Sequence, residues 1–191
     1  MRSVALFCSS SGGLPPATIE LAAQFGRLCG ERGVRLVYGG GARGLMGVAA
    51  GAAHAAGGAV LGIMLDALIR REGANVAIGD FHIVHTLEQR KREIIAASDA
   101  VVALPGGIGT LDEITEILVQ DDVGLARKPV CLCDVDGFWD PFDTMLERFA
   151  AYGVMRPGYR RDLLRADSAA AALDLCAAAL RGPRAAGSEP R

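Results

Sequence analysis

Short, uninterrupted apolar runs alternate with helical patterns along this chain, and this alternation restricts the fold more than any other feature. The apolar runs are Val4–Cys8, Val34–Tyr38, Ala59–Met64, His82–His85, Ala100–Leu104 and Val130–Cys133. The helical patterns are Pro16–Glu31, Leu45–Ala56, Thr86–Ala97, Leu111–Val123, Pro141–Tyr152 and Ala169–Leu180. Continuously apolar strands are typical of a parallel sheet that helices cover on both faces. The sequence therefore predicts an α/β fold with an open, doubly wound parallel sheet flanked by helices.

The extent of the domain follows from the same pattern. We expect residues 1–180 to form a single domain, because no linker or internal repeat interrupts the alternation. The last residues, 181–191, are rich in Gly, Pro, Ala and Ser and are predicted to be a flexible C-terminal tail.

Charge and hydropathy exclude several classes of protein. Lys and Arg total 20 against 22 for Asp and Glu, a formal charge of −2, which argues against a partner that is nucleic acid or an anionic membrane. The apolar start of the chain, Val4–Cys8, is too short for a signal peptide, and no later run approaches the ~18 residues of a membrane span. We therefore expect a cytoplasmic protein.

Five dispersed cysteines imply no disulfide framework, which fits a reducing compartment. Cys131 and Cys133 lie in an apolar run, and we interpret them as strand residues on alternate faces in preference to a metal site.

Three loops rich in glycine or serine follow predicted strands, at the ends where ligands bind to an open parallel sheet. The first, Cys8–Gly13, either lets a ligand approach closely or caps the next helix. The second, Tyr38–Gly47, which we call the GGG loop, contains the G-x-G-x-x-G spacing of dinucleotide-binding loops. The acidic residue expected about 20 positions later is not convincing, because Asp66 follows the wrong strand. The consecutive glycines still permit a tight turn against a ligand and the next helix.

The third loop, Pro105–Glu113, which we call the PGG loop, is suited to a phosphate. Its glycines leave backbone N–H groups free to converge, and the helix predicted to open at Thr110 points its positive end at the same place. No Gly-Lys-Ser/Thr follows, so ATP-driven chemistry is not expected. Glu113, in the first turn of this helix, either complements the helix dipole or takes part in chemistry.

Both glycine loops resemble motifs of the Lonely Guy family of nucleotide phosphoribohydrolases, whose members were often labelled lysine decarboxylases. The GGG loop matches G-G-G-x-x-G-L-M-G, and the PGG loop matches P-G-G-x-G-T-x-x-E. Arg90-Lys91 matches the family's Arg-Lys pair on the preceding helix, and Arg71-Glu72 matches an Arg-Glu pair after the third strand. The resemblance extends from about Val4 to about Leu164 and implies a Rossmann-like hydrolase domain.

What the family does defines the expected reaction. The resemblance implies hydrolysis of the N-glycosidic bond of a nucleoside 5′-monophosphate, which releases the free base and ribose 5-phosphate. The base is an N6-substituted adenine, so that the product is an active cytokinin, or the adenine of AMP. The resemblance implies neither a cofactor nor a metal. It does imply a homodimer or a larger homo-oligomer.

By the same resemblance, Arg90 and Glu113 form the catalytic pair. The implied substrate-binding residues are Ser10, Gly40, Gly41, Glu72, Arg90, Lys91, Gly106, Gly107, Ile108, Gly109, Thr110, Leu111, Asp112 and Glu113.

These residue types suit the reaction. Cleavage of a ribosyl C–N bond passes through an oxocarbenium-like state, whose positive charge a carboxylate such as Glu113 stabilises while it orients the attacking water. Arg90 stays charged and cannot act as a base; it either clamps the 5′-phosphate, which we favour, or donates to the departing purine. Glu72 is expected to accept from a ribose or base donor. Apart from the family match, Arg90 and Lys91 would be interpreted as a solvated helix face.

Three places depart from the family pattern: Ser9 stands where the family has Gly, Ile63-Met64-Leu65 stands where it usually has Ile-Pro, and the third is a segment of the helix that carries Glu113. Val119-Gln120-Asp121-Asp122 stands where the family commonly has Thr-Trp-Ala-Gln, on the same helix beyond Glu113. A hydroxyl and an indole are lost and two carboxylates are gained, so the preference for a particular base stays open.

Three alternative functions fit this sequence less well. A nucleotide or molybdenum-cofactor carrier of the same fold would have no need of a carboxylate beside an anion site. A nicotinamide oxidoreductase is disfavoured because the ribose-binding acid is missing. Lysine decarboxylation ordinarily needs pyridoxal phosphate on a lysine, and neither Lys91, flanked by arginines, nor Lys128, in a turn before a strand, suits that role.

Overall fold

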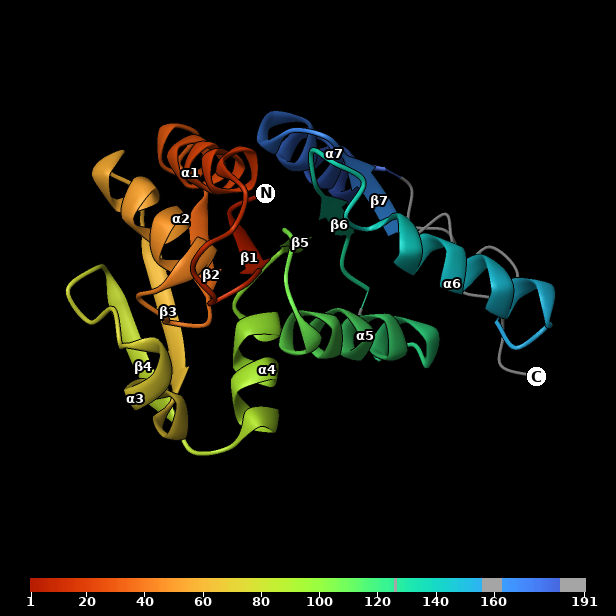
Figure 1. The fold of residues 1–191 in the computed structure, drawn as a ribbon, viewed down its shortest axis with the longest axis horizontal. Coiled ribbons are helices and arrows are strands. Elements are labelled where there is room, and N and C mark those ends of the chain that lie inside the picture. Colours follow the sequence, from red (N-terminus) through yellow and green to blue (C-terminus); the bar gives the residue numbers. More distant parts are fainter. Residues whose placement is uncertain (126, 156–162, 183–191) are drawn as a thin grey trace.

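The computed structural model describes residues 1–125, 127–155 and 163–182, which form one parallel sheet covered by helices (Figure 1). The strands are β1 (Ser3–Phe7), β2 (Arg35–Tyr38), β3 (Val60–Leu65), β4 (Asp80–Val84), β5 (Ala100–Ala103), β6 (Val130–Cys133) and β7 (Leu163–Ala166). The helices are α1 (Pro16–Glu31), α2 (Gly44–Ala55), the 3₁₀ turn η1 (Asp66–Leu68), α3 (Ile69–Glu72), α4 (Leu87–Ala96), α5 (Ile108–Asp122), α6 (Asp140–Ala151) and α7 (Ala169–Arg181). The predicted Rossmann-like, doubly wound α/β domain is confirmed.

The strand order places a ligand crevice at the centre of the sheet. The order is β4-β3-β2-β1-β5-β6-β7, and all pairings are parallel. The chain builds outward from β1 to β4 and then returns to β5 on the other side of β1, so its direction of growth reverses between β1 and β5. Loops leave such a point in opposite directions and open a crevice beyond the carboxyl ends of the strands.

Two apolar cores lie on the two faces of the sheet. Helices α1, α2 and α7 pack on one face, where Leu6 of β1 joins Phe25 and Leu173. Helices α4, α5 and α6 pack on the other, where Phe7 joins Ile94 and Ile114. Successive β1 residues thus point to opposite cores, which explains why the strand is apolar without interruption.

Several predicted boundaries were wrong. Strand β7 was not predicted, because its sequence Leu-Leu-Arg-Ala is short and only partly buried at the edge of the sheet. The opposite edge strand, β4, starts at Asp80 and is mostly exposed, so it is not covered on both faces as an inner strand is. Helix α5 begins at Ile108, before the predicted start at Thr110, because the glycines of the PGG loop enter its first turn. The short η1 and α3 were also missed.

Two further predictions concern the cysteines and the C-terminus. Cys131 and Cys133 lie in the same core, on the same face of β6, so the prediction of alternate faces was wrong: residues two apart on a strand share a face. All five cysteines are buried and free. Of the predicted tail, 181–191, residues 183–191 lie outside the described part of the chain, and Arg181 is the last residue of α7. Among the described residues, no helix is long and apolar enough to span a membrane.

Candidate active site

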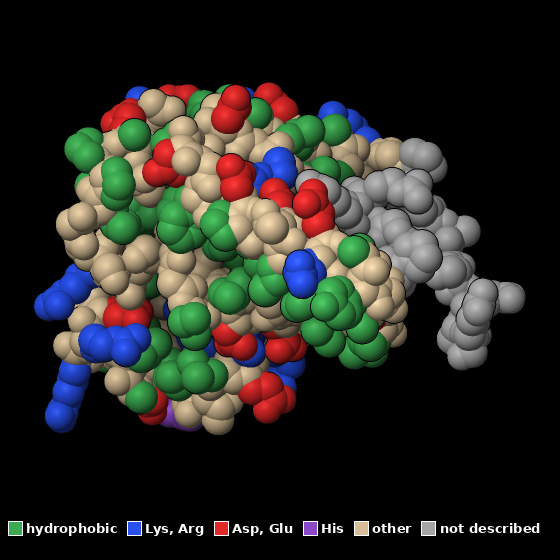
Figure 2. Space-filling model, turned by 45° about the vertical axis from the view of Figure 1, so that its right-hand side comes forward, with side chains coloured by type: hydrophobic (Ala, Val, Ile, Leu, Met, Phe, Trp, Pro, Cys, Tyr) green, Lys and Arg blue, Asp and Glu red, His purple; other side chains and the backbone are tan. Residues whose placement is uncertain are grey.

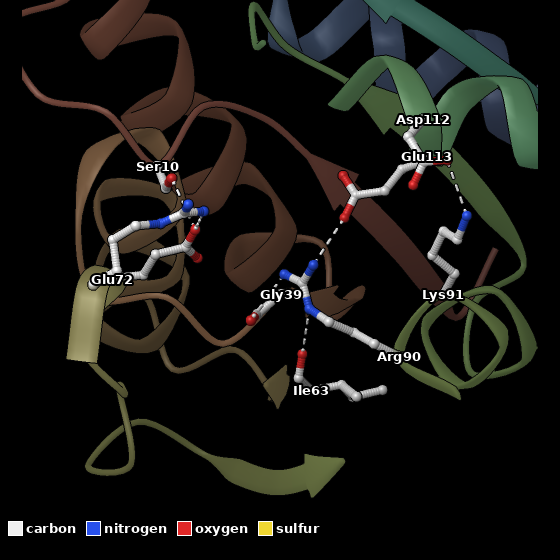
Figure 3. A network of polar contacts seen from close by, with 9 residues as sticks. Ser10, Gly39, Ile63, Glu72, Arg90, Lys91, Asp112 and Glu113 are labelled. Carbon is white, nitrogen blue, oxygen red and sulfur yellow. Dashed lines mark hydrogen bonds and ion pairs between the residues drawn. The ribbon is translucent and has the colours of Figure 1, made fainter. Parts of the chain in front are cut away.

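A buried ion pair lies at the carboxyl edge of the sheet. Arg90 extends from α4 and Glu113 from the first turns of α5, and Nη1 of Arg90 donates to Oε1 of Glu113 at 3.2 Å (Figure 3). The two side chains are 8% and 11% exposed. The structure therefore brings together the two residues predicted to be catalytic.

Two backbone carbonyls hold the guanidinium of Arg90 in place. Its Nη2 donates to the carbonyl of Gly39 at the end of β2, and its Nε donates to the carbonyl of Ile63 in β3, both at 3.1 Å. Sequence reasoning missed both carbonyls, since backbone acceptors leave no mark in a motif. The three bonds leave two N–H donors of the guanidinium available.

Burial changes the acidity of Glu113. Loss of hydration raises the pKa of this carboxyl from 4.5 to about 7, and the charge of Arg90 opposes the rise without cancelling it. The carboxylates of Asp112 and Glu72 raise this pKa further, whereas Lys91 lowers it. Burial beside Glu113 also raises the pKa of the Cys8 thiol, at the end of β1. A raised pKa such as that of Glu113 is typical of carboxyls that work in catalysis.

Figure 3 shows Glu72, at the end of α3, on the other side of Arg90 from Glu113. The side chain of Glu72, 7% exposed, accepts from Oγ of Ser10 at 3.2 Å and from Nη2 of Arg71 at 2.9 Å, both at Oε1. Its Oε2 is buried without a hydrogen-bond partner in the structure. An unpaired carboxylate oxygen is costly, so this atom is a candidate acceptor for a donor group. Ser10 and Glu72 thus come together as predicted site residues, and Arg71 was not predicted to be one.

The PGG loop forms an open helix N-terminus close to the pair. Gly107 and Gly109 have no atom within 4 Å of where a Cβ would lie, and Ile108 is 83% exposed. Gly106 has a structural task, because a Cβ there would lie 2.1 Å from Oγ1 of the buried Thr110. The first N–H groups of a helix have no partners within it and attract anions. This loop can therefore receive a phosphate.

In the GGG loop, the predicted contact residues Gly40 and Gly41 face protein atoms. A Cβ on Gly40 would lie 3.0 Å from Cβ of Met64, and one on Gly41 would lie 3.1 Å from Cε of Met46. Gly41 also lies next to the unpaired Oε2 of Glu72, at 3.5 Å from the position of its Cβ. These two glycines therefore let the GGG loop pack closely against Met46, Met64 and the carboxyl of Glu72.

Lys91, Asp112 and Leu111 lie outside the cluster around Arg90. Figure 3 shows the side chain of Lys91 pointing away from Arg90 towards Asp112. Its Nζ donates to Oδ1 of Asp112 at 3.0 Å and to Oε2 of Glu116 at 3.2 Å. Leu111 is half-buried against the core beneath α5. The segment that departs from the family pattern, from Val119, lies in the last turns of α5, where Val119 is 60% exposed.

The arrangement gathers several charged groups at the carboxyl edge of the sheet. A buried carboxylate of raised pKa is fixed by an arginine, an open helix N-terminus suits an anion, and a second carboxylate faces them. Among the described residues, no group of three or more His, Cys, Asp or Glu side chains is placed to hold a metal ion.

Comparisons with known proteins extend over most of the chain. A family model described as "Possible lysine decarboxylase" matches residues 46–176. The cytokinin riboside 5′-monophosphate phosphoribohydrolase LOG7 of Arabidopsis thaliana is 39% identical over 168 residues, which cover 88% of this chain and 77% of that protein. The corresponding enzyme LOG of Oryza sativa subsp. japonica is 36% identical over 88% of this chain and 69% of its own length.

Solved structures share the fold at low identity. The molybdenum cofactor binding protein from Rippkaea orientalis superposes with a TM-score of 0.71 at 22% identity, covering 94% of this chain and 97% of that one. The molybdenum cofactor carrier protein of Chlamydomonas reinhardtii gives 0.69 at 20% identity, over 93% and 98% of the two chains. At such identities the likeness shows the fold alone.

Proposed function

The chain belongs to the Lonely Guy (LOG) family, and from that premise we propose that it hydrolyses the N-glycosidic bond of nucleoside 5′-monophosphates to a free base and ribose 5-phosphate. One observation carries the proposal: a buried carboxylate, Glu113, whose pKa is raised to about 7, is held by Arg90 beside the open N-terminus of α5.

Glu113 acts on the sugar. As the C–N bond lengthens, positive charge develops on the ribose, and an ionised carboxylate in a desolvated site stabilises it far more than one in water. The same carboxylate orients the attacking water and accepts its proton. The side chain of Glu113 is 11% exposed, so substrate and water can reach it.

Arg90 holds Glu113 while it donates to substrate. Its bonds to Gly39, Ile63 and Glu113 fix the guanidinium, and its two remaining N–H donors are available to the 5′-phosphate or the departing purine. The rigid three-point attachment keeps Glu113 at one position, which is the positional accuracy that catalysis needs.

The nucleotide is oriented by its two ends. The phosphate binds at the N–H groups of Gly107, Ile108 and Gly109, where the helix dipole favours an anion. Ile108 precedes Glu113 by five residues, or about 7.5 Å along the axis, which leaves room for the ribose between them. Ser10 and the unpaired Oε2 of Glu72 accept from ribose or base donors on the other wall.

The substrate is an adenine-type nucleotide, cytokinin riboside 5′-monophosphate or AMP. The relatives named for cytokinin riboside 5′-monophosphate support the first, and the enzyme would then produce an active cytokinin. It would work in the cytoplasm as an N-glycosidase that needs only water.

Neither lysine decarboxylation nor a carrier function has support in the site. Decarboxylation of lysine would need a lysine free to form a Schiff base, but Nζ of Lys91 bonds two carboxylates and Nζ of Lys128 donates to the carbonyl of Ser98. The carrier proteins are fold relatives only.

The active form is proposed to be a homodimer. In Figure 2, which brings the α6 side of the molecule forward, hydrophobic side chains gather in patches between charged ones. Val119 in the last turn of α5 and Val123 and Leu125 just after this helix are 60%, 60% and 79% exposed. Because exposed apolar patches of this kind mark association surfaces, we expect a second copy of the chain to cover them. Light scattering on a size-exclusion column would measure the mass, and a monomer at micromolar concentration would contradict the dimer.

The direct test is release of free base from a panel of nucleoside 5′-monophosphates that includes AMP and N6-isopentenyl adenylate. We expect release by the wild type and loss of at least ~10²-fold in kcat for Glu113→Gln. Binding of the nucleotides without release would instead indicate a carrier. The ranking of the bases by their rates of release shows which base is selected by Val119–Asp122, the segment at the end of α5 that departs from the family pattern.

A further inference from the structure

The two oxygens of the Glu72 carboxylate have different surroundings. Oε1 accepts from Oγ of Ser10 at 3.2 Å and from Nη2 of Arg71 at 2.9 Å. Oε2 is buried and has no hydrogen-bond partner among the described residues. Because the side chain is only 7% exposed, bulk water does little to compensate this oxygen. The two donors at Oε1 therefore decide where the unpaired Oε2 points.

The backbone of Glu72 is held without help from the Arg71 side chain. Helix α3 is a single turn, and Gly73, with a φ of +69°, ends it. The backbone N–H of Ala42, in the GGG loop, lies 3.3 Å from the carbonyl oxygen of Glu72 and 3.1 Å from that of Gly73. Loss of the Arg71 side chain would therefore leave Glu72 in place at the end of α3 and free only the rotation of its carboxylate.

The exposure of Arg71 separates its effect on Glu72 from an effect on stability. The Arg71 side chain is 73% exposed, and an ion pair with so exposed a cation contributes little to the free energy of unfolding. A buried carboxylate, in contrast, needs a positive partner, and the planar guanidinium of an arginine fixes the direction of the oxygen that it binds. The adjacent Arg70 is also exposed, but in the part of the chain that the structure describes it forms no ion pair.

We propose that Arg71 is a positioning residue of the nucleotide site: with the hydroxyl of Ser10 it holds Oε1 of Glu72 and so turns Oε2 towards a donor group of the substrate. This inference rests on the proposed function, in which Oε2 accepts from the ribose or the base, and it adds a residue that the sequence did not assign to the site. A ribose hydroxyl or an amine of the base would supply the hydrogen bond that Oε2 lacks. Arg71 acts through Glu72 and makes no contact with the nucleotide.

The experiment measures kcat/KM for release of free base by wild type, Arg71→Met, Glu72→Gln and the double variant. Four substrates differ in one donor each: AMP, its 2′-deoxy and 3′-deoxy analogues, and purine riboside 5′-monophosphate, which lacks the exocyclic amine. The ratio of variant to wild type on each substrate cancels the difference in intrinsic reactivity between the substrates.

The expected result is selective loss. Arg71→Met should lower kcat/KM for AMP about tenfold, the loss typical of one charge-assisted hydrogen bond, and less than twofold for the analogue that lacks the donor bound by Oε2. That analogue identifies the donor as a ribose hydroxyl or the amine of the base. In the Glu72→Gln background, Arg71→Met should cost less than twofold on AMP, because its effect passes through Glu72.

Two further variants serve as controls. Arg70→Met removes the adjacent cation on the same turn and should leave kcat/KM within twofold of wild type on every substrate. Arg71→Lys keeps a cation beside Glu72 and should lose only about threefold on AMP, with the same selectivity among the analogues. It carries the comparison if circular dichroism shows that Arg71→Met fails to fold.

A direct contact between Arg71 and the nucleotide would give a different pattern. Arg71→Met would then cost the same on all four substrates, which share the 5′-phosphate, and as much in the Glu72→Gln background as in wild type. Either result overturns the positioning role. Absence of base release by the wild type would instead refute the proposed hydrolysis, and calorimetric binding of the same nucleotides to the same variants would then test Arg71 by the same comparison.

Discussion

The GGG loop and the PGG loop have the same kind of sequence but do different work. In the GGG loop, every glycine replaces a side chain that would collide with or press on the protein itself: the Cβ positions of residues 39, 40, 41, 44 and 47 lie 1.8, 3.0, 3.1, 2.5 and 2.1 Å from other protein atoms. In the PGG loop, Gly107 and Gly109 meet nothing within 4 Å. The glycines of the first loop therefore let the scaffold close, whereas Gly107 and Gly109 leave open space at the start of α5, where we propose that the phosphate binds.

The difference shows that a glycine motif does not by itself identify a ligand contact. The G-x-G-x-x-G spacing of the GGG loop is that of a dinucleotide site, yet its first glycine makes room for Arg90 and its fourth for the Ser9–Ser11 backbone. Glycine is selected at both loops for close approach of a backbone, and only the fold says to what.

The largest effect expected from this comparison is that of Gly39→Ala. The added Cβ would lie 1.8 Å from Nη2 of Arg90, so the guanidinium must move and lose its bonds to Gly39 and Glu113. We expect kcat for base release to fall by at least ~10²-fold in a protein that still folds, because the end of a side chain can shift where a backbone cannot. Gly12→Ala, in open space, is the control, and activity within threefold of wild type for Gly39→Ala would contradict this account.

The second effect is on stability. Gly44 has a φ of +59° and its Cβ would lie 2.5 Å from the carbonyl carbon of Ser10, so Gly44→Ala combines backbone strain with a collision. We expect the free energy of unfolding in urea to fall by about 2–4 kcal/mol. Gly51→Ala in the same helix α2 has no neighbour within 4 Å and should stabilise the protein by about 0.5–1 kcal/mol. Equal effects at the two positions would refute the comparison.

The third effect is on the pH dependence of kcat/KM, which tests the role of Glu113, the last residue of the PGG loop. Burial favours the neutral form of Glu113 up to about pH 7, whereas the reaction needs the ionised form. On the acidic side kcat/KM should therefore rise about tenfold per pH unit and level off above about pH 7. The phosphate of the substrate, whose second pKa is about 6, also titrates in this range. Its titration is a property of the substrate and is therefore the same for the wild type and for any variant. An inflection near pH 4.5, the ordinary value for Glu, would show that Glu113 is not the group that titrates.

The smallest effect should come from Gly107→Ala, which is the counterpart of Gly39→Ala in the PGG loop. The new methyl group meets no protein atom, so the melting temperature should stay within about 1–2 °C of wild type. If the phosphate binds there, KM for AMP should rise several-fold because the methyl group faces the ligand. An unchanged KM would place the phosphate elsewhere.

Much of the fold followed from local sequence pattern. The inner strands, such as β1 and β5, are apolar at every position because both of their faces are buried, and this pattern is visible without a structure. The helix α1 was predicted with both of its ends, Pro16 and Glu31. The edge strands were harder: β4 was predicted too short and β7 was missed, because an edge strand is partly solvated and does not need a continuous apolar run.

The candidate site was partly visible in the sequence. The family motifs identified Arg90, Glu113 and Glu72, and the structure places these residues near one another at the carboxyl edge of the sheet, where their roles are proposals. The carbonyls of Gly39 and Ile63 and the two acidic partners of Lys91 were not foreseen. They arise from contacts between residues that lie 21 to 51 positions apart in the chain.

The sequence by itself determined the alternation of the inner strands with the long helices, the doubly wound topology and the position of the glycine loops at strand ends, because periodicity and turn chemistry are local properties. Only the tertiary structure decided what each glycine makes room for, which of the cations Arg90 and Lys91 pairs with Glu113, and why the pKa of Glu113 is raised. These properties depend on burial and on distances between atoms from separate elements, and both exist only once the sheet has formed and the helices have packed against it.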